Sequence, residues 1–470
     1  MSKVVLGGGL GGLAAAHYLT KKATNQTLTL IESSSRTGGW IKTNLQENGT
    51  VFEQGPRTIR PRGEAGSNTL ELVEELNLTD QIVPLLSSHP AAQNRMIYAN
   101  GSLHLLPSSL FGLFKKQEPF TKPLVLHLLN DLKAKKKSVQ DESVYEFVDR
   151  RFGKEVADYL ISPLICGICA GNAQEISVKF LMRKLFEYEQ QYGSISKGMV
   201  QNFSLKSKKA TVLNGLVLKA KKEKWNIYSF ISGCETLPLA LKESILKNNV
   251  NLKLNSKCTS MTIGQNNVTL HLSNKEVVTA DYLISAIPAR NLGMLLQKQY
   301  PDLAHSLLNL VKNVSVAVVN LEFKNDLIKN SAFGLLVAPK EELPVLGVIY
   351  DSCCFPKENG GTVLTVMMGG YWFENYFGKN PNEKTLLNIA LNQVKQILSI
   401  HDVPVRSKVN ILHHCLPQYV VGHDDNLSEI NNYIKTHQLP ISLCGSSYYG
   451  VGINDVIMSA KTAVNKLIFI

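Results

Sequence analysis

The apolar positions at the start of the chain predict a strand, a tight turn, a helix and a second strand. Residues 4–6 form a short β-branched run, which glycines separate from a helical apolar stretch at residues 13–19. Residues 28–32, rich in leucine and isoleucine, are predicted as the second strand. This order predicts a βαβ unit.

Beyond this unit the apolar pattern changes twice. Residues 70–165 show mostly helical periodicity, with one apolar helix face at Leu70 to Leu76 and another at Val144 to Val148. Antiparallel strands are predicted for residues 251–272 and 314–323, and buried strands for residues 281–288 and 441–445. Residues 455–470 return to helical periodicity.

Length and composition predict a folded chain of several lobes. The 470 residues exceed one ordinary domain about threefold, and 44% hydrophobic with 19% charged residues excludes long disorder. No apolar window reaches the ~18 to 20 residues of a spanning helix. Since the first strand begins at Val4, we expect no cleavable presequence and internal targeting information.

The net charge of +12 is concentrated in two lysine-rich segments. Residues 115–137 and 206–224 each contain seven lysines, and with their three acidic residues they account for +11. Apolar residues beside the first segment suit an anionic lipid surface, and a solvated lysine face explains the charge equally well. Nucleic acid ranks last, because both segments lack arginine and no base-stacking aromatic series appears.

The cysteines and histidines do not predict a metal site. The eight cysteines are scattered through a long chain, which argues against a disulfide framework. Cys166 and Cys169 form a CxxC pair, but no second pair follows at zinc-ribbon spacing. We interpret them as buried apolar thiols.

A glycine motif after the first strand predicts dinucleotide binding. Gly7-Gly8-Gly9-Leu10-Gly11-Gly12 contains GxGxxG, in which the glycines permit a tight turn, close approach of a pyrophosphate and close packing of helix on sheet. A glycine-rich turn alone can be purely structural. Glu32 ends the second strand 20 residues after Gly12, where a carboxylate can accept hydrogen bonds from ribose hydroxyls.

The segment after Glu32 identifies a family. Glu32 to Gly39 read ExxxRxGG, which resembles the second signature of the FAD-dependent amine oxidase and phytoene desaturase superfamily. Further segments resemble the animal mitochondrial protoporphyrinogen oxidases, in the same order along almost the whole chain: residues 32–34, 38–41, 55–61, 89–95, 170–172, 285–289, 316–321, 350–352, 416–419 and 448–455. Residues 197–224 match this family poorly.

The resemblance implies a fold of three parts, in the α/β and α+β classes. A Rossmann-like FAD-binding domain would be built from both chain ends, comprising residues 1–75, about 225–285 and 410–470. A mainly helical membrane-binding lobe would span about 90–210, and a mixed-sheet substrate domain about 76–89 and 286–409.

The resemblance also implies FAD-mediated, six-electron oxidation of protoporphyrinogen IX, with three O2 reduced to H2O2, in the penultimate step of haem biosynthesis. One noncovalent FAD per chain is expected, with the flavin performing the redox chemistry and no protein group acting as a catalytic base. The expected FAD contacts are Gly7, Gly8, Gly9, Leu10, Gly11, Gly12, Glu32, Ser33, Arg36, Gly39, Trp40, Gly55, Pro56, Arg57, Thr58, Cys258, Ser446, Val451, Gly452 and Ile453. From the residues alone, Gly450 and Gly452 also fit a simple turn between strand and helix.

For the substrate, the resemblance implies that Arg57 and Arg95 lie near propionates, since a guanidinium pairs well with a carboxylate. Arg57 could instead order the loop under the flavin. The expected walls of the tetrapyrrole site are Phe333, Gly334, Leu336 and Met367, each of which also fits an ordinary core position.

The family further implies a peripheral protein on the intermembrane-space side of the mitochondrial inner membrane, a homodimer, and product transfer to ferrochelatase. Two alternatives share the glycine motif. A sister amine oxidase would have paired aromatic residues before the flavin, and a Rab-escort or GDI-like binding protein would lack flavin catalysis. The segment at residues 447–451 argues against the amine oxidase, and the intact ExxxRxGG motif together with the C-terminal stretch argues against the binding protein.

Overall fold

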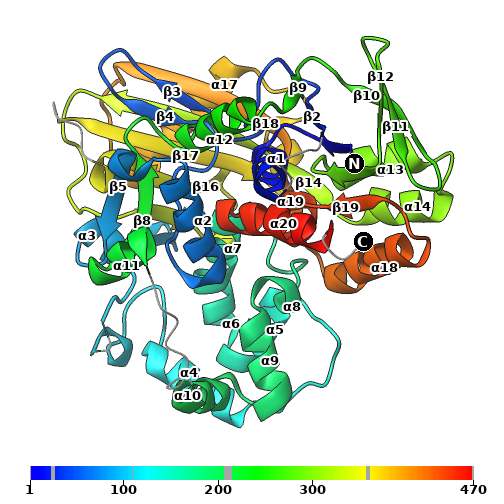
Figure 1. The fold of residues 1–470 in the computed structure, drawn as a ribbon. Coiled ribbons are helices and arrows are strands. Elements are labelled where there is room, and N and C mark those ends of the chain that lie inside the picture. The colour runs from blue at the N-terminus through cyan, green and yellow to red at the C-terminus, as the bar shows by residue number, and fades with distance from the viewer. Residues whose placement is uncertain (1, 23–26, 110, 206–213, 356–359, 468–470) are drawn as a thin grey trace. The chain divides into compact units, whose positions relative to one another are not determined.

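The computed structural model describes residues 2–22, 27–109, 111–205, 214–355 and 360–467 (Figure 1). The chain divides into two compact units, each built from segments that are distant in sequence. Unit 1 comprises Met1–Pro84, Asn214–Lys312 and Asp425–Ile470, and unit 2 comprises Leu85–Leu213 and Asn313–Asp424. The finer division into FAD, substrate and membrane domains remains a prediction.

Unit 1 contains a five-stranded parallel sheet with the strand order β19-β13-β1-β2-β9. Its strands are β1 (Lys3–Leu6), β2 (Leu28–Ile31), β9 (Asn251–Lys253), β13 (Tyr282–Ser285) and β19 (Ile441–Leu443). The central strand β1 is almost wholly buried, as its run of apolar residues predicts for a sheet covered on both faces. The predicted βαβ unit and the buried strands near residues 281–288 and 441–445 are confirmed.

The two ends of the chain meet on this sheet. Helix α1 (Leu10–Lys22) lies beside α20 (Ile453–Lys466), and α2 (Gly63–Glu75) packs against α20 (Figure 1). An added Cβ on Gly11 would lie 3.3 Å from Cγ1 of Val456, so the small residue permits the close approach of the two helices. The expectation that both chain ends build one domain is confirmed for unit 1.

The other elements of unit 1 surround this sheet. They are β3 (Thr43–Leu45), β4 (Val51–Glu53), α11 (Gly215–Lys222), β8 (Trp225–Phe230), α12 (Thr236–Lys247), β10 (Cys258–Ile263), β11 (Val268–Leu272), β12 (Val277–Ala280), α13 (Ala289–Leu296), α14 (Pro301–Asn309) and α19 (Ser446–Tyr449). Strands β10, β11 and β12 form a separate antiparallel sheet. The prediction of antiparallel strands over residues 251–272 is therefore wrong for β9, which pairs in parallel with β2, because pattern alone cannot reveal a partner distant in sequence.

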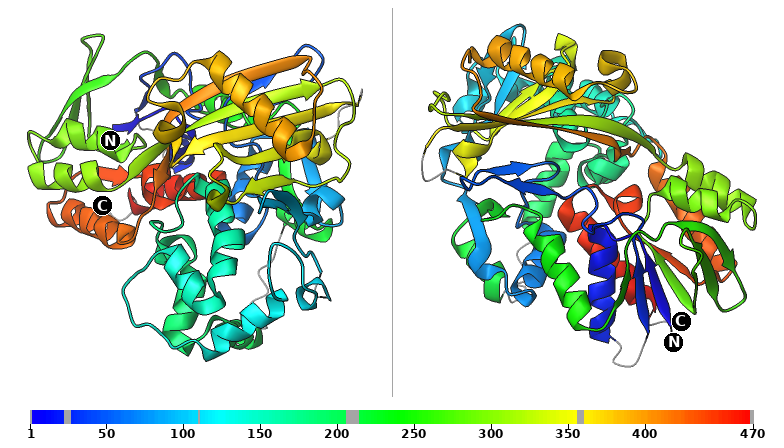
Figure 2. Two further views of the ribbon diagram at one scale, coloured as in Figure 1. Left: turned by 180° about the vertical axis from the view of Figure 1, so that it is seen from behind. Right: turned by 90° about the horizontal axis from the view of Figure 1, so that it is seen from above.

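Unit 2 is organised on a seven-stranded mixed sheet with the order β18-β14-β17-β16-β15-β6-β7. Its strands are β6 (Met96–Ala99), β7 (Ser102–Leu105), β14 (Lys312–Phe323), β15 (Gly334–Val337), β16 (Val345–Tyr350), β17 (Thr362–Gly370) and β18 (Arg406–Gln418). Helix α17 (Glu383–Leu398) covers one face of this sheet (Figure 2). On that face, Leu386 and Ala390 join a large apolar cluster with strand residues such as Val366. The predicted strand at residues 314–323 is confirmed as β14, which pairs antiparallel with β17.

The mostly helical pattern predicted for residues 70–165 is wrong over residues 82–105. This segment forms β5 (Ile82–Leu86), the short helix α3 (Pro90–Gln93), and strands β6 and β7. Strand β6 pairs in parallel with β15, far along the chain. Short apolar runs are compatible with either a helix or a strand. Here, pairing with the distant strand β15 determines that residues 96–99 form a strand.

The remaining segments of unit 2 are mainly helical. They are a 3-10 turn (Phe111–Phe114), α4 (Leu124–Lys133), α5 (Val144–Phe152), α6 (Lys154–Val156), a π-helical turn (Ala157–Ile161), α7 (Ser162–Cys169), α8 (Val178–Leu181), α9 (Arg183–Tyr192), α10 (Ile195–Leu205), α15 (Asp351–Cys354) and α16 (Phe373–Phe377). Helix α18 (His423–Thr436) begins at the boundary between the units. Within the described ranges, we find no helix with the length and apolar content required to span a bilayer.

A buried ion network holds the helical part of unit 2 together. Arg151 and Asp131 are fully buried and form an ion pair of 3.0 Å, and Arg151 also pairs with the buried Glu189. Asp131 accepts further hydrogen bonds from the Ser194 hydroxyl and the Ser196 N–H. These hydrogen bonds lower the pKa of the Asp131 carboxyl despite its burial. The network therefore fixes α4 against α5, α9 and α10.

The CxxC pair lies inside unit 2. Cys166 and Cys169 are 2% and 1% exposed, and burial raises the pKa of each thiol to about 12. Their thiols donate to the carbonyls of Gly171 and Ile165. This confirms the interpretation of both as buried apolar cysteines.

Candidate functional site

The loops that follow the parallel strands of unit 1 gather at one edge of the sheet. The Gly7 N–H donates to the carbonyl of Ile31, and the Ala286 N–H donates to the carbonyl of Leu6. In the same way, the Cys444 N–H donates to the carbonyl of Ser285. In open α/β sheets this carboxyl edge is the usual position of ligands.

The glycine motif forms a cradle at this edge. Gly7 has φ +105, and an added Cβ on Gly12 would overlap the Gly7 carbonyl oxygen, so strand and helix can meet only with glycine at both positions. Gly9 differs, because among the described residues only the Cα of Gly39 would lie within 4 Å of an added Cβ. The space beside Gly9 is open, and the first N–H groups of α1 lack acceptors within the helix. This arrangement can bind an anion such as a pyrophosphate.

Glu32 lies at the adjacent strand end, as predicted. Its carboxylate accepts hydrogen bonds from the Gly8 N–H at 2.6 Å and from the Ser34 N–H and hydroxyl at 2.8 Å. The Ser33 hydroxyl also donates to it, at 3.2 Å. The backbone of Ser256 donates to the Glu32 carbonyl, which places the segment before Cys258 beside this loop.

Arg36 braces its own loop. Its guanidinium donates to the carbonyls of Thr37 at 2.6 Å and Gly39 at 2.5 Å. Gly38 and Gly39 have positive φ, and the Gly38 N–H donates to the carbonyl of Gly8. The ExxxRxGG motif thus holds a second glycine loop against the first.

The segment from Gly55 to Thr58 lies against the same loop. An added Cβ on Gly55 would overlap the carbonyl of Trp40, whose side chain is 44% exposed. Arg57 is only 7% exposed, and its positive charge acts on the buried thiol of Cys234. Pro56 is exposed and Thr58 is half-buried.

The C-terminal segment completes this edge. Gly445 has φ +103 and its Cα lies 3.4 Å from the position of a Cβ on Gly11, so Ser446 follows directly beside the start of α1. Val451 and Gly452 precede α20, and the Asn454 amide donates to the carbonyl of Arg60. Neither Gly445 nor Asn454 was predicted as a site residue, although a glycine directly after a buried strand is a recognisable signal.

Two titratable groups near this edge have shifted pKa values. Burial raises the pKa of the Asp455 carboxyl, in the first turn of α20, above its ordinary value. Burial also raises the pKa of the Cys258 thiol, which donates to the Ser260 carbonyl, to about 11. A thiol with this pKa stays protonated at neutral pH, so Cys258 adds no negative charge to this edge.

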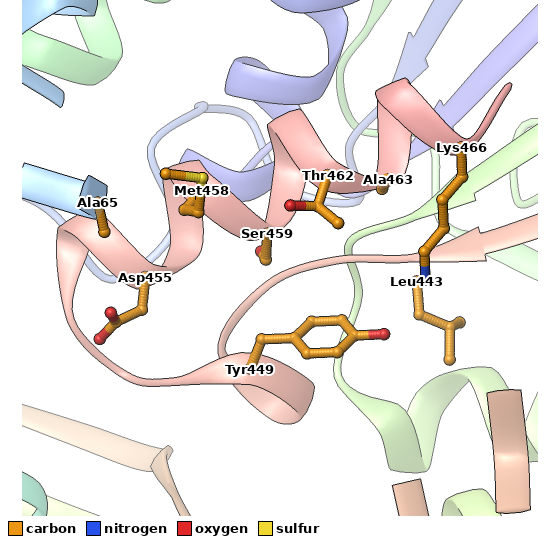
Figure 3. Close-up of a pocket in the computed structure, with 9 residues that line it drawn as sticks. All are labelled: Ala65, Leu443, Tyr449, Asp455, Met458, Ser459, Thr462, Ala463 and Lys466. Carbon is orange, nitrogen blue, oxygen red and sulfur yellow. The ribbon is translucent and has the colours of Figure 1, made fainter. Parts of the chain in front are cut away.

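A cavity of about 190 Å³ lies behind this edge, along α20 (Figure 3). It is lined by Ala65, Leu443, Tyr449, Asp455, Met458, Ser459, Thr462, Ala463 and Lys466. None of the predicted FAD contacts lines it. Within the described residues, no group of three His, Cys, Asp or Glu side chains is arranged to hold a metal ion.

Two of the predicted substrate residues, Leu336 and Met367, share one face of the seven-stranded sheet of unit 2. Leu336 pairs with Gly347, and Gly347 pairs with Met367, so Leu336 and Met367 point to the same face of the seven-stranded sheet. This face is opposite to the one that packs on α17, and we name it the α7 face because α7 covers part of it near Gly167. Both side chains are half-buried.

Arg95 and Phe333 lie together in the same unit. The Arg95 guanidinium is 5.6 Å from the centre of the Phe333 ring, and it donates to the carbonyls of Ala91 and Asn94. Gly334 follows with φ +149 at the start of β15, where an added Cβ would meet the backbone of β16. Arg57 belongs to unit 1, and Arg95 belongs to unit 2.

The unit 1 edge fits a flavin dinucleotide. It offers open space at Gly9, backbone donors at the start of α1 and a carboxylate at Glu32, each suited to one part of such a cofactor. The noncovalent character and the contact list remain predictions.

Known proteins agree with this interpretation. Residues 10–468 match the family of flavin-containing amine oxidoreductases. The human protoporphyrinogen oxidase is 37% identical over 98% of this chain and 97% of its own length, and the bovine enzyme is 36% identical over 99% and 98%. A crystal structure of an Exiguobacterium protein, 23% identical, has the same fold, with a TM-score of 0.80 over 99% of this chain and 98% of that chain.

These matches and the glycine cradle lead to one assignment: the chain is a flavin oxidoreductase that belongs to the flavin-containing amine oxidoreductase family, together with the protoporphyrinogen oxidases.

Proposed function

We propose that this chain binds one noncovalent FAD and uses O2 to oxidise protoporphyrinogen IX to protoporphyrin IX. Six electrons leave the substrate in three two-electron steps, and three O2 become three H2O2. This reaction is the penultimate step of haem biosynthesis. The observation that carries the proposal is the near full-length similarity to the human protoporphyrinogen oxidase, in a chain that keeps the glycine cradle and Glu32.

The residues of unit 1 would hold the cofactor. Bound FAD would supply the redox chemistry, accepting electrons from the porphyrinogen and passing them to O2. The open space at Gly9 and the N-terminus of α1 suit the pyrophosphate, and Glu32 can exchange the Gly8 N–H for a ribose hydroxyl. The N-terminus of α20 favours negative charge nearby, which suits a reduced flavin ring at Val451 to Ile453.

The proposal is tested on the purified full chain. Release of a yellow cofactor by heat and its separation from FMN decide the identity and the noncovalent binding of FAD. Growth of porphyrin fluorescence with protoporphyrinogen IX, with equal consumption of O2 and formation of H2O2 at three per porphyrin, supports the reaction. A chain that retains FAD without oxidising the porphyrinogen would contradict it.

We also propose that the chain attaches peripherally to the mitochondrial inner membrane, on the intermembrane-space side. The 3-10 turn presents Phe111 and Phe114, which are 85% and 66% exposed. On α4, residues Leu126, Leu128, Leu129 and Leu132 are each 44–48% exposed, while His127 and Asp131 face inward. Exposed apolar residues beside Lys115, Lys116 and Lys133 suit an anionic bilayer surface.

Some lysines of the first segment already have partners within unit 2 and are less suitable for the test. Lys137 pairs with Glu142 at 3.2 Å, and Lys136 donates to the Gln190 carbonyl at 2.6 Å, so both have partners within unit 2. Of the second lysine segment, residues 206–213 lie outside the described residues, and the later lysines belong to unit 1.

Charge neutralisation at Lys115, Lys116, Lys133 and Lys135 should reduce sedimentation with anionic vesicles, at about 1 kcal/mol per lysine. The matched control neutralises Lys219, Lys221, Lys222 and Lys224 in unit 1. Equal release of the two variants from the vesicles would contradict the proposal that this surface of unit 2 binds the membrane.

Two partner proposals rest on the family resemblance: the chain acts as a homodimer, and it passes its product to ferrochelatase. Sedimentation velocity of the detergent-free protein tests the first. A monomer at micromolar concentration would contradict it.

A further inference from the structure

A ladder of polar side chains crosses the otherwise apolar centre of the α7 face. Asn320 on β14 and Thr365 on β17 are paired neighbours, and both side chains are 0% exposed. The Asn320 amide donates to the Thr365 hydroxyl at 2.9 Å, and that hydroxyl donates to the Asp351 carboxylate at 2.7 Å. The Asn320 N–H and the Thr365 hydroxyl each donate to a partner here, as buried polar groups usually do.

The ladder has a direction. A hydroxyl has one proton, and because the Thr365 oxygen accepts from Asn320, its proton is directed toward Asp351. Asp351 is half-buried, so the ladder runs from two fully buried side chains to a carboxylate with access to solvent. A carboxylate has lone pairs for about four hydrogen bonds. The hydrogen bond from Thr365 therefore holds the Asp351 carboxylate, a hydrogen-bond acceptor, in one orientation.

Asp351 lies close to one of the predicted substrate residues, Phe333, and bonds to the sheet face that carries two others. Thr365 precedes Met367 by two residues on the same strand and so shares the α7 face with Met367 and Leu336. Asp351 follows the final residue of β16, Tyr350, whose N–H donates to the Phe333 carbonyl. Helix α15, which begins at Asp351, packs against α3, which ends two residues before Arg95.

From this placement we propose that Asp351, oriented by Thr365 and Asn320, accepts hydrogen bonds from the pyrrole N–H groups of the reduced tetrapyrrole. The inference rests on the proposed function and extends it from the propionates to the centre of the macrocycle. In this arrangement the Arg95 guanidinium binds a propionate at the periphery of the ring. The Asp351 carboxylate accepts from the pyrrole N–H groups at its centre.

The chemistry of the substrate gives this acceptor a specific consequence. A porphyrinogen carries four pyrrole N–H donors, whereas the oxidised porphyrin has two N–H groups and two imine nitrogens that are themselves acceptors. A fixed carboxylate therefore binds the reduced ring better than the oxidised one, because two acceptors that face each other repel. Asp351 would make the site selective for substrate over product.

The test compares substrate and product binding in variants of the full-length holoenzyme. Asp351→Asn keeps the shape and an acceptor for Thr365 but removes the charge. We expect KM for protoporphyrinogen IX to rise about tenfold to a hundredfold, as for loss of a charge-assisted hydrogen bond, and kcat to change less. The inhibition constant of protoporphyrin IX should change by less than about threefold.

Three further variants separate positioning from packing. Thr365→Val should raise KM by a smaller factor than Asp351→Asn, and Thr365→Ser should restore the parent value because it keeps the hydroxyl. Asp402→Asn is the matched control, since Asp402 is exposed and accepts a hydrogen bond from Asn325 elsewhere in unit 2. Flavin content and Tm are measured for each protein.

The outcomes are distinct. An active parent with an unchanged KM in Asp351→Asn overturns this inference alone. Equal rises in KM and in the product inhibition constant also overturn it, since general damage to the pocket affects both ligands. A parent that binds flavin but does not oxidise the porphyrinogen overturns the proposed function, and this inference with it.

Discussion

The two large sheets of this protein present their functional residues in different ways. The parallel sheet of unit 1 uses its edge, where loops of glycine and one carboxylate follow consecutive strands. The mixed sheet of unit 2 uses its face, where Leu336, Met367 and Thr365 project from paired strands. An edge of this kind recognises a ligand mainly through backbone groups, and a face recognises it through side chains.

This difference decides how substitutions act. At the edge, the space left by an absent Cβ is part of the site. Replacing glycine by alanine there should therefore cause a large loss of flavin binding. On the face, each side chain contributes separately, so single substitutions should change affinity without loss of the fold. The predictions below test this contrast.

The largest effect is expected for Gly12→Ala compared with Gly9→Ala. The added Cβ on Gly12 would overlap the Gly7 carbonyl oxygen, so this variant should lose both bound flavin and stability. At Gly9 the space is open, so Gly9→Ala should keep the Tm of the flavin-free protein and lose only the flavin. Flavin absorbance and thermal unfolding measure both. A Gly9→Ala variant with full flavin content would contradict the proposal that the cofactor occupies the space beside Gly9.

A second comparison sets Arg57→Ala in unit 1 against Arg95→Ala in unit 2. Arg57 is 7% exposed, so its removal should cost about 2 kcal/mol or more in the free energy of unfolding and reduce flavin content. Arg95 is exposed and stacks on Phe333, so its removal should raise KM for protoporphyrinogen IX about tenfold with normal flavin content.

The burial of Arg57 favours the bracing role that the sequence left open over direct contact with propionates. Denaturant unfolding, flavin content and steady-state kinetics of both variants test this assignment. A Tm and flavin content for Arg57→Ala equal to those of the parent, with a raised KM, would restore the substrate role.

The third prediction concerns Glu32, the carboxylate of the unit 1 edge. Glu32→Ala should weaken FAD binding by roughly 1 to 3 kcal/mol, because a hydrogen-bond acceptor for the ribose is lost. Titration of the flavin-free variant with FAD measures the change in Kd. Glu75→Ala serves as the control, since Glu75 lies on α2 and pairs with Lys21 away from the cradle. Equal affinity in the Glu32 variant and the parent would oppose the assignment.

The smallest effect is expected from the Asp455 carboxyl. Burial raises its pKa in the folded chain, so folding becomes less favourable as pH rises from the ordinary value of 3.8 through the raised value. Asp455→Asn should therefore raise the Tm of the flavin-free protein at neutral pH, and the gain should vanish at pH values below the ordinary pKa. A gain of the same size at every pH would point to packing instead of charge.

Sequence alone determined the unit 1 edge. A strand, a glycine turn and a helix are encoded within about thirty residues, and the backbone geometry of Gly7 and Gly12 admits few alternatives. The motif, the carboxylate of Glu32 and the family resemblance could therefore be recognised from the sequence alone. Arg36 was expected among the FAD contacts, and only the structure revealed that its guanidinium binds the carbonyls of its own loop.

Only the tertiary structure decided the arrangement of unit 2. Strand β6 was hidden in a segment with helical periodicity, because its partner β15 lies far along the chain and pairing energy outweighs local preference. The same long-range register brings Asn320, Thr365 and Asp351 into one ladder. A short local motif reports its own geometry, whereas a sheet face assembled from distant strands is defined only when those strands are paired.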